Sequence, residues 1–247
     1  MSALSITVAR WGLRIAPRLT TRLAAPRVRG TTASAVDGGT LVVTSGASGV
    51  ADASGAPSST GASGSSGHGL RTVVVIFSPR PLAMRWLAAT LAKRLSAAVV
   101  IVDSIDDPIA AVERARFLVD SELPVTVVGE GSAAAAALDA SRQQVRRVAL
   151  IAPREVGPVD PAGVPTTLIQ DSESSPSRAE TVALERALRS GGVGVREPGY
   201  RGVTDGWARL PRVSSGTQRA LDDLVQFVER GVGPTATFDV IPGWDLH

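Results

Sequence analysis

Cysteine is absent from this 247-residue chain, which excludes disulfides, thiolate nucleophiles and zinc–thiolate sites. Histidine is almost absent as well: His68 lies in a Ser/Gly-rich tract, and His247 is the last residue. A histidine-based metal site would need these two distant positions to meet. We therefore expect neither a metal centre nor a bound cofactor.

Lysine occurs once, at Lys93, so arginine carries almost all of the positive charge. The chain has 26 basic and 23 acidic residues, a net charge of +3, but the excess is uneven. Residues 1–70 hold six arginines and two aspartates, which leaves 20 basic and 21 acidic residues for the remainder. A near-neutral body argues against a nucleic-acid-binding core, which needs a clustered basic face.

Long apolar runs are missing too, and none approaches the length of a membrane span. The segment Leu4–Ala9 is short and polar for the apolar part of a signal peptide, and arginines follow it where they should precede it. These features predict a cytoplasmic protein.

Residues 1–30 form a basic arm with arginines at helical spacing. On a helix, one face would hold Arg10, Arg14, Arg18 and Arg22. An adjacent apolar stripe would hold Trp11, Ile15 and Leu19. Pro17 limits any long continuous helix. Two interpretations stay open: contact with a membrane surface or a cap, or a partly ordered extension with a solvated basic face, which we favour.

Residues 31–69 are predicted to form a linker. Residues 40–44 could be a short strand, but residues 45–69 are nearly all Gly, Ser, Ala and Thr. Such a segment buries too little apolar surface to offset the entropy of ordering it. A globular domain is expected over residues 70–233, followed by a tail over residues 234–247.

Apolar strands alternate with helices from residue 70 onward. Strands are predicted at residues 72–77, 98–102, 125–128, 145–151, 166–169 and 193–196. Helices are predicted at residues 82–95, 108–119, 132–140 and 178–189, with an amphipathic final helix over residues 221–228. This order indicates an α/β fold: a mostly parallel, doubly wound sheet covered by helices on both faces.

In such sheets, ligands bind beyond the carboxyl ends of the strands. The segments directly after predicted strands are therefore the places to look for chemistry. They are Ser78–Pro81, Glu130–Ser132, Gln170–Pro176 and Tyr200–Trp207.

Together these segments resemble the hormone-sensitive-lipase-like branch of the α/β-hydrolase esterases, over residues 70 to about 233. Val128-Gly129-Glu130-Gly131-Ser132-Ala133 is similar to the family's nucleophile elbow, V-A-G-D-S-A-G. Tyr200-x-Gly202-x-x-Asp205-Gly206-Trp207 is similar to its Y-P-G-x-x-H-G-F motif, and Ser175-Pro176-x-Arg178 to its D-P-L-R-D motif. The resemblance implies an α/β-hydrolase sheet and, for a complete triad, carboxylic-ester hydrolysis.

The resemblance implies which positions of this chain correspond to the family's catalytic residues, and none of these positions holds the family's residue. The nucleophile position holds Gly131, the acid position Ser175 and the base position Asp205. The family's H-G-G-G oxyanion turn is replaced by Ser78–Pro81, whose two prolines remove backbone donors that an oxyanion hole needs. These four replacements predict a hydrolase scaffold without its triad.

Two alternative interpretations place a catalytic or cation-binding site at the carboxyl end of the sheet. Ser132 could be a displaced nucleophile with Asp205 as its base, although we expect Ser132 to cap the following helix. Asp171, Glu173 and Asp205 could form a carboxylate site. We expect these acidic side chains to be merely solvated, because they lie in a polar loop.

The turn at Gly131 has a further possible use. The free N–H groups of the next helix favour an anion or a carbonyl oxygen, and glycine leaves room there, although Gly131 could simply satisfy the turn. A short connection over residues 151–166 leaves the site open.

Our first hypothesis is a non-catalytic relative that binds a small acyl or carboxylate ligand, or a partner, through Gly131, Ser132, Ser175 and Asp205. The second is an active ester hydrolase around Ser132 and Asp205, and the third a degenerate relative without selected activity.

Overall fold

The computed structural model describes residues 28–36, 38–44, 69–103, 105–119, 122–200, 203, 206–209 and 215–231. Nearly all of the predicted basic arm, most of the Gly/Ser-rich segment, the C-terminal tail and Asp205 lie outside the described residues. Among the described residues, no helix combines the length and apolar character needed to cross a membrane.

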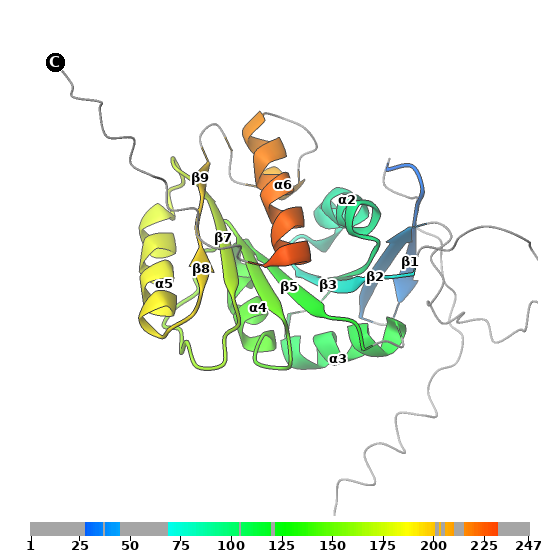
Figure 1. Cartoon of the computed structure of the whole chain (residues 1–247), viewed down its shortest axis with the longest axis horizontal. Coiled ribbons are helices and arrows are strands. Elements are labelled where there is room, and N and C mark those ends of the chain that lie inside the picture. Colours follow the sequence, from blue (N-terminus) through cyan, green and yellow to red (C-terminus); the bar gives the residue numbers. More distant parts are fainter. Residues whose placement is uncertain are drawn as a thin grey trace, which may run out of the picture.

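One mostly parallel sheet organises the described residues (Figure 1). Its parallel strands follow the spatial order β4 (Ala97–Val102), β3 (Thr72–Phe77), β5 (Val125–Glu130), β6 (Arg147–Ile151), β7 (Thr167–Ser172) and β8 (Val195–Arg196). The short strand β9 (Gly199–Tyr200) pairs with the end of β7. Each strand from β3 to β7 is buried along its whole length. Burial on both faces explains why β3 and β4 are almost continuous apolar runs rather than alternating ones, whereas β7 also contains the buried polar residues Gln170 and Asp171.

A hairpin extends the sheet on the β4 side. It consists of β1 (Thr31–Val36) and β2 (Gly39–Thr44), and β2 pairs antiparallel with β4. The predicted linker over residues 31–69 is wrong for residues 31–36, which form β1, whereas the short strand predicted at residues 40–44 is confirmed as β2. Val42 is fully buried, and a side chain at Gly39 would come within 2.2 Å of the Ile101 carbonyl oxygen, so glycine permits the close approach of the two strands.

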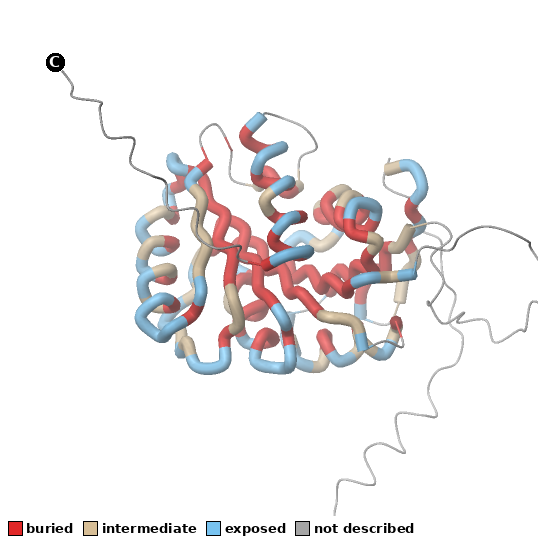
Figure 2. Tube along the Cα trace, viewed as in Figure 1, coloured by how far each residue is buried: buried red, intermediate tan, exposed pale blue. Residues whose placement is uncertain are grey.

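Helices cover both faces of the sheet (Figures 1 and 2). The first face carries α2 (Arg85–Leu95) and α6 (Ser215–Arg230), and the second carries α3 (Pro108–Val119), α4 (Ala134–Ala140) and α5 (Arg178–Ser190). Side chains of β3 alternate between the two cores: Val74 and Ile76 pack in the first, Val73 and Val75 in the second. The predicted doubly wound α/β architecture is confirmed.

Candidate site at the strand switch point

The chain reverses its direction of winding between β3 and β5. These strands are parallel neighbours, yet β3 leads through the 3-10 turn η1 (Pro81–Met84) into α2 on the first face, whereas β5 leads into α4 on the second. The loops that leave the two carboxyl ends therefore diverge. In open α/β sheets this divergence creates the crevice where ligands bind, so the residues directly after Phe77 and at the end of β5 form the candidate site.

The turn after β5 has the geometry of an elbow: a strand, a 3-10 turn η2 (Gly131–Ala133) and then α4. Gly129 is required for close packing, because a Cβ there would lie 2.6 Å from the Ala137 Cβ and 2.9 Å from the Ala134 Cα. Gly131 has φ +61°, a left-handed conformation that glycine adopts without strain. Among the described residues, a Cβ at Gly131 would meet only the Pro79 side chain, at 3.9 Å.

Glu130, the last residue of β5, is buried at this candidate site, with 2% of its surface exposed. Ser78 Oγ, from the end of β3, donates a hydrogen bond of 2.8 Å to Glu130 Oε2. The guanidinium of Arg209 donates to Glu130 Oε1 and forms an ion pair with it. Arg209 lies in the 3-10 turn η3 (Trp207–Arg209), so the pair joins the elbow to the segment just after position 205.

Ser78 also accepts a hydrogen bond of 3.0 Å from the Arg80 N–H. The buried hydroxyl of Ser78 thus links the segment Ser78–Pro81, which replaces the family's oxyanion turn, to the end of β5. Arg209 Nε is buried and has no hydrogen-bond partner among the described residues. In the described part of the chain, the candidate site therefore contains the Glu130–Arg209 ion pair and one buried donor without a partner, Arg209 Nε.

Comparison with known proteins gives matches only at the level of structure. No known family profile and no curated protein sequence matches the chain. A hormone-sensitive lipase from a metagenome library superimposes with a TM-score of 0.63 at 13% identity, over 93% of this chain and 97% of that one. The bacterial heroin esterase gives a TM-score of 0.59 at 14% identity, over 93% and 91% of the two chains. A hyperthermophilic esterase from the archaeon Pyrobaculum calidifontis gives 0.59 at 12% identity, over 93% and 98%.

This chain has the α/β-hydrolase fold. The neighbours include hormone-sensitive-lipase-type esterases, as the motif resemblance predicts, and at such low identity the likeness establishes the fold alone. The function of the α/β-hydrolase scaffold in this chain depends on the residues at its site.

Ser132 is exposed at the elbow of this α/β-hydrolase fold. The prediction that it caps the following helix is wrong: Glu130 occupies the cap position of η2, Ala133 occupies that of α4, and neither makes a side-chain cap hydrogen bond. The reason is the intervening 3-10 turn, which delays the start of α4 until Ala134. The sequence contains no signal for that extra turn.

Ser175, at the family's acid position, is buried in the turn after β7. Its Oγ lies 2.9 Å from Ser177 Oγ and accepts a 3.3 Å hydrogen bond from the Ser177 N–H. These bonds stay within the turn, so Ser175 has a local structural partner rather than one at the elbow. Gly131 and Ser132 thus share one turn, Ser175 lies in another, and Asp205 is outside the described residues.

Asp171 is not the solvated loop residue that the sequence suggests. It lies on β7 with 2% of its surface exposed. Its carboxylate accepts hydrogen bonds from the Ser172 N–H (2.8 Å) and from Thr181 Oγ1 on α5 (2.7 Å). Glu173 is exposed. Asp171 therefore anchors α5 to the sheet, and no group of acidic and histidine side chains in the described part of the chain could hold a metal ion.

A buried hydroxyl network fastens α6 beside the site. Gln170 Nε2 on β7 donates to Tyr200 Oη (2.8 Å) and to the Ala220 carbonyl (2.7 Å). Tyr200 Oη in turn donates to Asp223 (2.8 Å), which also pairs with Arg196 at 2.7 Å. Tyr200 begins the segment that resembles the family's base loop, and this network fixes where that segment starts.

Tyr200 offers a direct test of this burial, because it is the only tyrosine in the chain. Burial raises the pKa of its hydroxyl above the ordinary value of 10.0. The unfolded chain therefore ionises first, so the stability contribution is fully present below pH 10.0 and is lost as the pH rises further. We expect the native protein to show no phenolate absorbance at an alkaline pH where a urea-unfolded sample shows it. An ordinary titration midpoint in the native protein would contradict the network.

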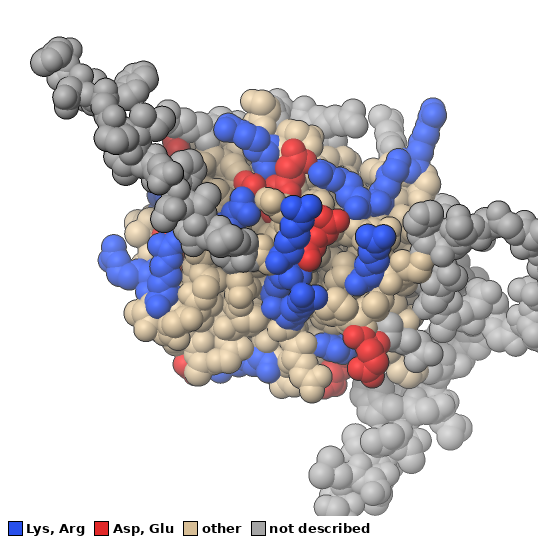
Figure 3. All heavy atoms as spheres, viewed as in Figure 1, with Lys and Arg blue, Asp and Glu red and all other residues tan. Residues whose placement is uncertain are grey.

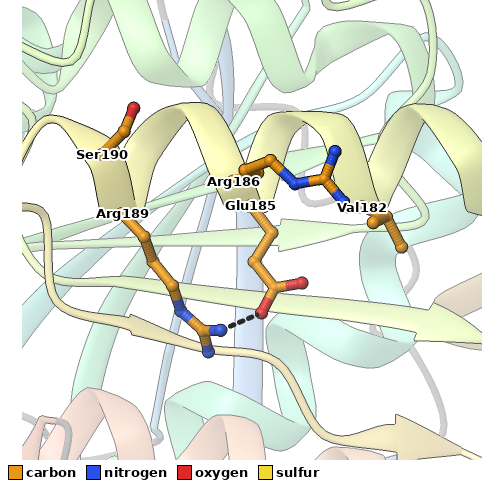
Figure 4. Close-up of a pocket in the computed structure, with 5 residues that line it drawn as sticks. All are labelled: Val182, Glu185, Arg186, Arg189 and Ser190. Atoms are coloured by element: carbon orange, nitrogen blue, oxygen red, sulfur yellow. Dashed lines mark ion pairs between the residues drawn. The ribbon is translucent and has the colours of Figure 1, made fainter.

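A shallow hollow of about 460 Å³ lies on the outer surface of α5, away from the elbow (Figure 4). All of its lining residues come from that one helix: Val182, Glu185, Arg186, Arg189 and Ser190. Glu185 and Arg189 form an ion pair of 2.7 Å across it. A hollow lined by a single exposed helix has no convergent polar groups, so it does not compete with the switch point as the candidate site.

Proposed function

We propose that this protein is a non-hydrolysing α/β-hydrolase-fold protein that binds a ligand or partner at the switch point. The observation that carries the proposal is the elbow with glycine at the nucleophile position: Gly131 keeps the left-handed turn, and glycine has no side chain that could act as a nucleophile. Acyl transfer at an elbow needs a nucleophile beside a general base. Both histidines of the chain, at positions 68 and 247, are remote in sequence from the motif where the family places its base.

The Glu130–Arg209 ion pair supports the same proposal. Glu130 is buried and Arg209 is partly buried, with 23% of its side chain exposed, so loss of Arg209 would leave a buried carboxylate without its ionic partner, which indicates a structural role for the pair. An enzyme of this fold would instead need donors aimed at a developing oxyanion. The prolines at positions 79 and 81 provide none, and the N–H between them, that of Arg80, is already bonded to Ser78.

The ligand we propose is a small acyl or carboxylate compound. Gly131 supports this ligand class, because among the described residues only Pro79 lies within 4 Å of a Cβ placed there. The Nε of Arg209, which has no hydrogen-bond partner in the described part of the chain, is a donor suited to a carbonyl or carboxylate oxygen. Basic and acidic side chains are interspersed on the surface shown in Figure 3, in keeping with a small ligand or protein partner rather than nucleic acid.

The alternative function is an active carboxylic-ester hydrolase centred on Ser132, with Asp205 as its base. One observation favours it: Ser132 is exposed and its hydroxyl is not committed to a helix cap. We rank this function second because an aspartate is a weak base at neutral pH unless its pKa is strongly raised.

Ester hydrolysis separates the two functions. We expect the full chain to hydrolyse p-nitrophenyl butyrate no faster than heat-unfolded protein, and Ser132→Ala to leave that background unchanged. A fluorophosphonate probe should leave Ser132 unlabelled. Turnover above background that Ser132→Ala removes, or probe labelling of Ser132, would establish the alternative instead. Ser78→Ala is the matched control, because Ser78 is the other serine at the crevice but is buried.

Binding is tested separately with butyrate itself. We expect butyrate to raise the melting temperature of the wild-type protein and not that of Gly131→Asn, in which a side chain fills the space above the turn. Asparagine tolerates the left-handed conformation, so this variant should fold. An equal shift in both proteins would place butyrate elsewhere.

A location in the cytoplasm and contact of residues 1–30 with a membrane surface are further parts of this proposal. Fractionation of cells that produce the full chain, compared with a chain that starts at residue 28, tests both. Membrane association that depends on residues 1–27 would favour the surface-contact interpretation of the arm over the solvated one.

A further inference from the structure

Three buried N–H donors beside the candidate site have no acceptor in the described part of the chain. They are Arg85 Nε, Trp207 Nε1 and Arg209 Nε. The other buried side-chain atoms without a partner among the described residues are oxygens, of Thr126 on β5 and Gln170 on β7. Buried donors are almost always hydrogen-bonded in native proteins, so three exceptions in one region call for an explanation.

These three donors come from adjoining elements. Arg85 is the first residue of α2 and directly follows η1, whereas Trp207 and Arg209 both lie in η3. The turn η3 packs against η1 and against α2. Arg209 and Ser78, the residue that ends the β3 side of the site, both donate to the Glu130 carboxylate. The three N–H groups therefore belong to one junction of η1, α2 and η3 beside the end of β5.

Positive charge exceeds negative charge at this junction. The described segments that meet there, residues 78–85, 130–133 and 207–209, contain three arginines and one glutamate, which gives them a net charge of +2. The glutamate is Glu130, whose two carboxylate oxygens already accept from Ser78 and Arg209. Guanidinium groups match the geometry of carboxylate and phosphate oxygens. The junction therefore favours an anionic group as the acceptor for the donors that no described residue satisfies.

We propose that the ligand of the switch point is doubly anionic: a short acyl compound with a carboxylate at one end and a second carboxylate or a phosphate group at the other. This inference rests on the proposed function, which gives Arg209 Nε to the first carboxylate. Arg85 Nε and Trp207 Nε1 then remain for the second anionic group. A monocarboxylate would leave both of these donors without an acceptor and one positive charge without a counterpart.

Butyrate and succinate are matched probes of this second group. Both have four carbon atoms, and succinate replaces the terminal methyl group of butyrate with a second carboxylate. We expect isothermal titration calorimetry of the full chain, at neutral pH and one fixed ionic strength, to show that succinate binds about tenfold tighter than butyrate. The same is expected of 3-phosphonopropionate, in which a phosphonate replaces one carboxylate of succinate. Whichever dianion binds tighter identifies the second group as a carboxylate or a phosphate.

Two substitutions assign the second group to its donors. Arg85→Met removes the guanidinium, and Trp207→Phe removes the indole N–H but keeps an aromatic ring in the core. Each should weaken succinate binding about tenfold and leave butyrate binding unchanged. Arg94→Met is the matched control, because it removes an exposed arginine from the same helix, and it should change neither affinity.

The outcomes distinguish failure of this proposal from failure of the function on which it rests. Equal affinity for butyrate and succinate would overturn the second anionic group and leave the proposed function intact. Tighter binding of succinate that neither Arg85→Met nor Trp207→Phe weakens selectively would overturn it as well, because the second charge would then bind elsewhere. Binding of none of the three compounds would overturn both proposals.

Discussion

Arg209→Met is expected to lower the free energy of unfolding by about 3–5 kcal/mol. The carboxylate of Glu130 is 2% exposed, and the Arg209 guanidinium is its ionic partner. Methionine keeps much of the side-chain volume but leaves a buried charge for which, among the described residues, the Ser78 hydroxyl is the remaining side-chain donor. The desolvation cost of that charge is then no longer offset. Urea denaturation followed by tryptophan fluorescence measures the loss.

The double variant Glu130→Gln, Arg209→Met separates charge from packing. Glutamine can still accept the hydrogen bond from Ser78, and it removes the unpaired charge, so we expect most of the lost stability to return. Arg94→Met is the surface control: Arg94 and Asp222 form an exposed pair of 2.7 Å, for which a loss below about 1 kcal/mol is expected. Equal losses for Arg94→Met and Arg209→Met would mean that the site pair is no more important than a surface contact.

Gly129→Ala is expected to cost about 3 kcal/mol, in the upper part of the range for overpacked cores. The added methyl group would lie 2.6 Å from the Ala137 Cβ and 2.9 Å from the Ala134 Cα, and both atoms belong to α4. Helix α4 must therefore move away from β5, and the elbow opens. Thermal and urea unfolding of the purified variant give the magnitude.

Gly131→Asn is the matched control two residues later. Its backbone is left-handed, which asparagine tolerates, and the space around its Cβ is open. We expect a cost below about 1 kcal/mol. If Gly131→Asn proved as damaging as Gly129→Ala, backbone conformation rather than packing would control the elbow, and the close approach of α4 to β5 would not explain Gly129.

The fold can be predicted because its evidence is local. The largely apolar segments at residues 72–77 and 125–128 are long enough for buried strands, and the helices between strands show regular periodicity. The elbow is also predictable, since a strand, two small residues and a helix come one after another within a few positions. The hairpin strand β1 escapes prediction because Thr, Ala and Ser give little alternation, and its partner β2 pairs with β4, far along the chain.

The contents of the site depend on contacts that the sequence does not reveal. Glu130 is visible as an acidic residue in the elbow, but its partner Arg209 is 79 residues away and belongs to no motif. Asp171 resembles a solvated residue because polar residues come after it, whereas its partner Thr181 lies on the next helix. Arg147 is another example: it is buried at the start of β6 and donates to the Val228 carbonyl near the end of α6. Only the packed helix explains why an arginine is tolerated there.

The separation between Glu130 and Arg209 also bears on how the protein is made. A ribosome delivers the strands around Glu130 well before it delivers Arg209, and domains tend to fold as units during synthesis. A nascent chain that closed its central sheet early would enclose a carboxylate with no counter-ion, at a cost of several kcal/mol. We therefore expect the central sheet to pack stably only after the segment that contains Arg209 has been synthesised. A chain that ends before Arg209 would lack the ionic partner that Glu130 has in the folded protein.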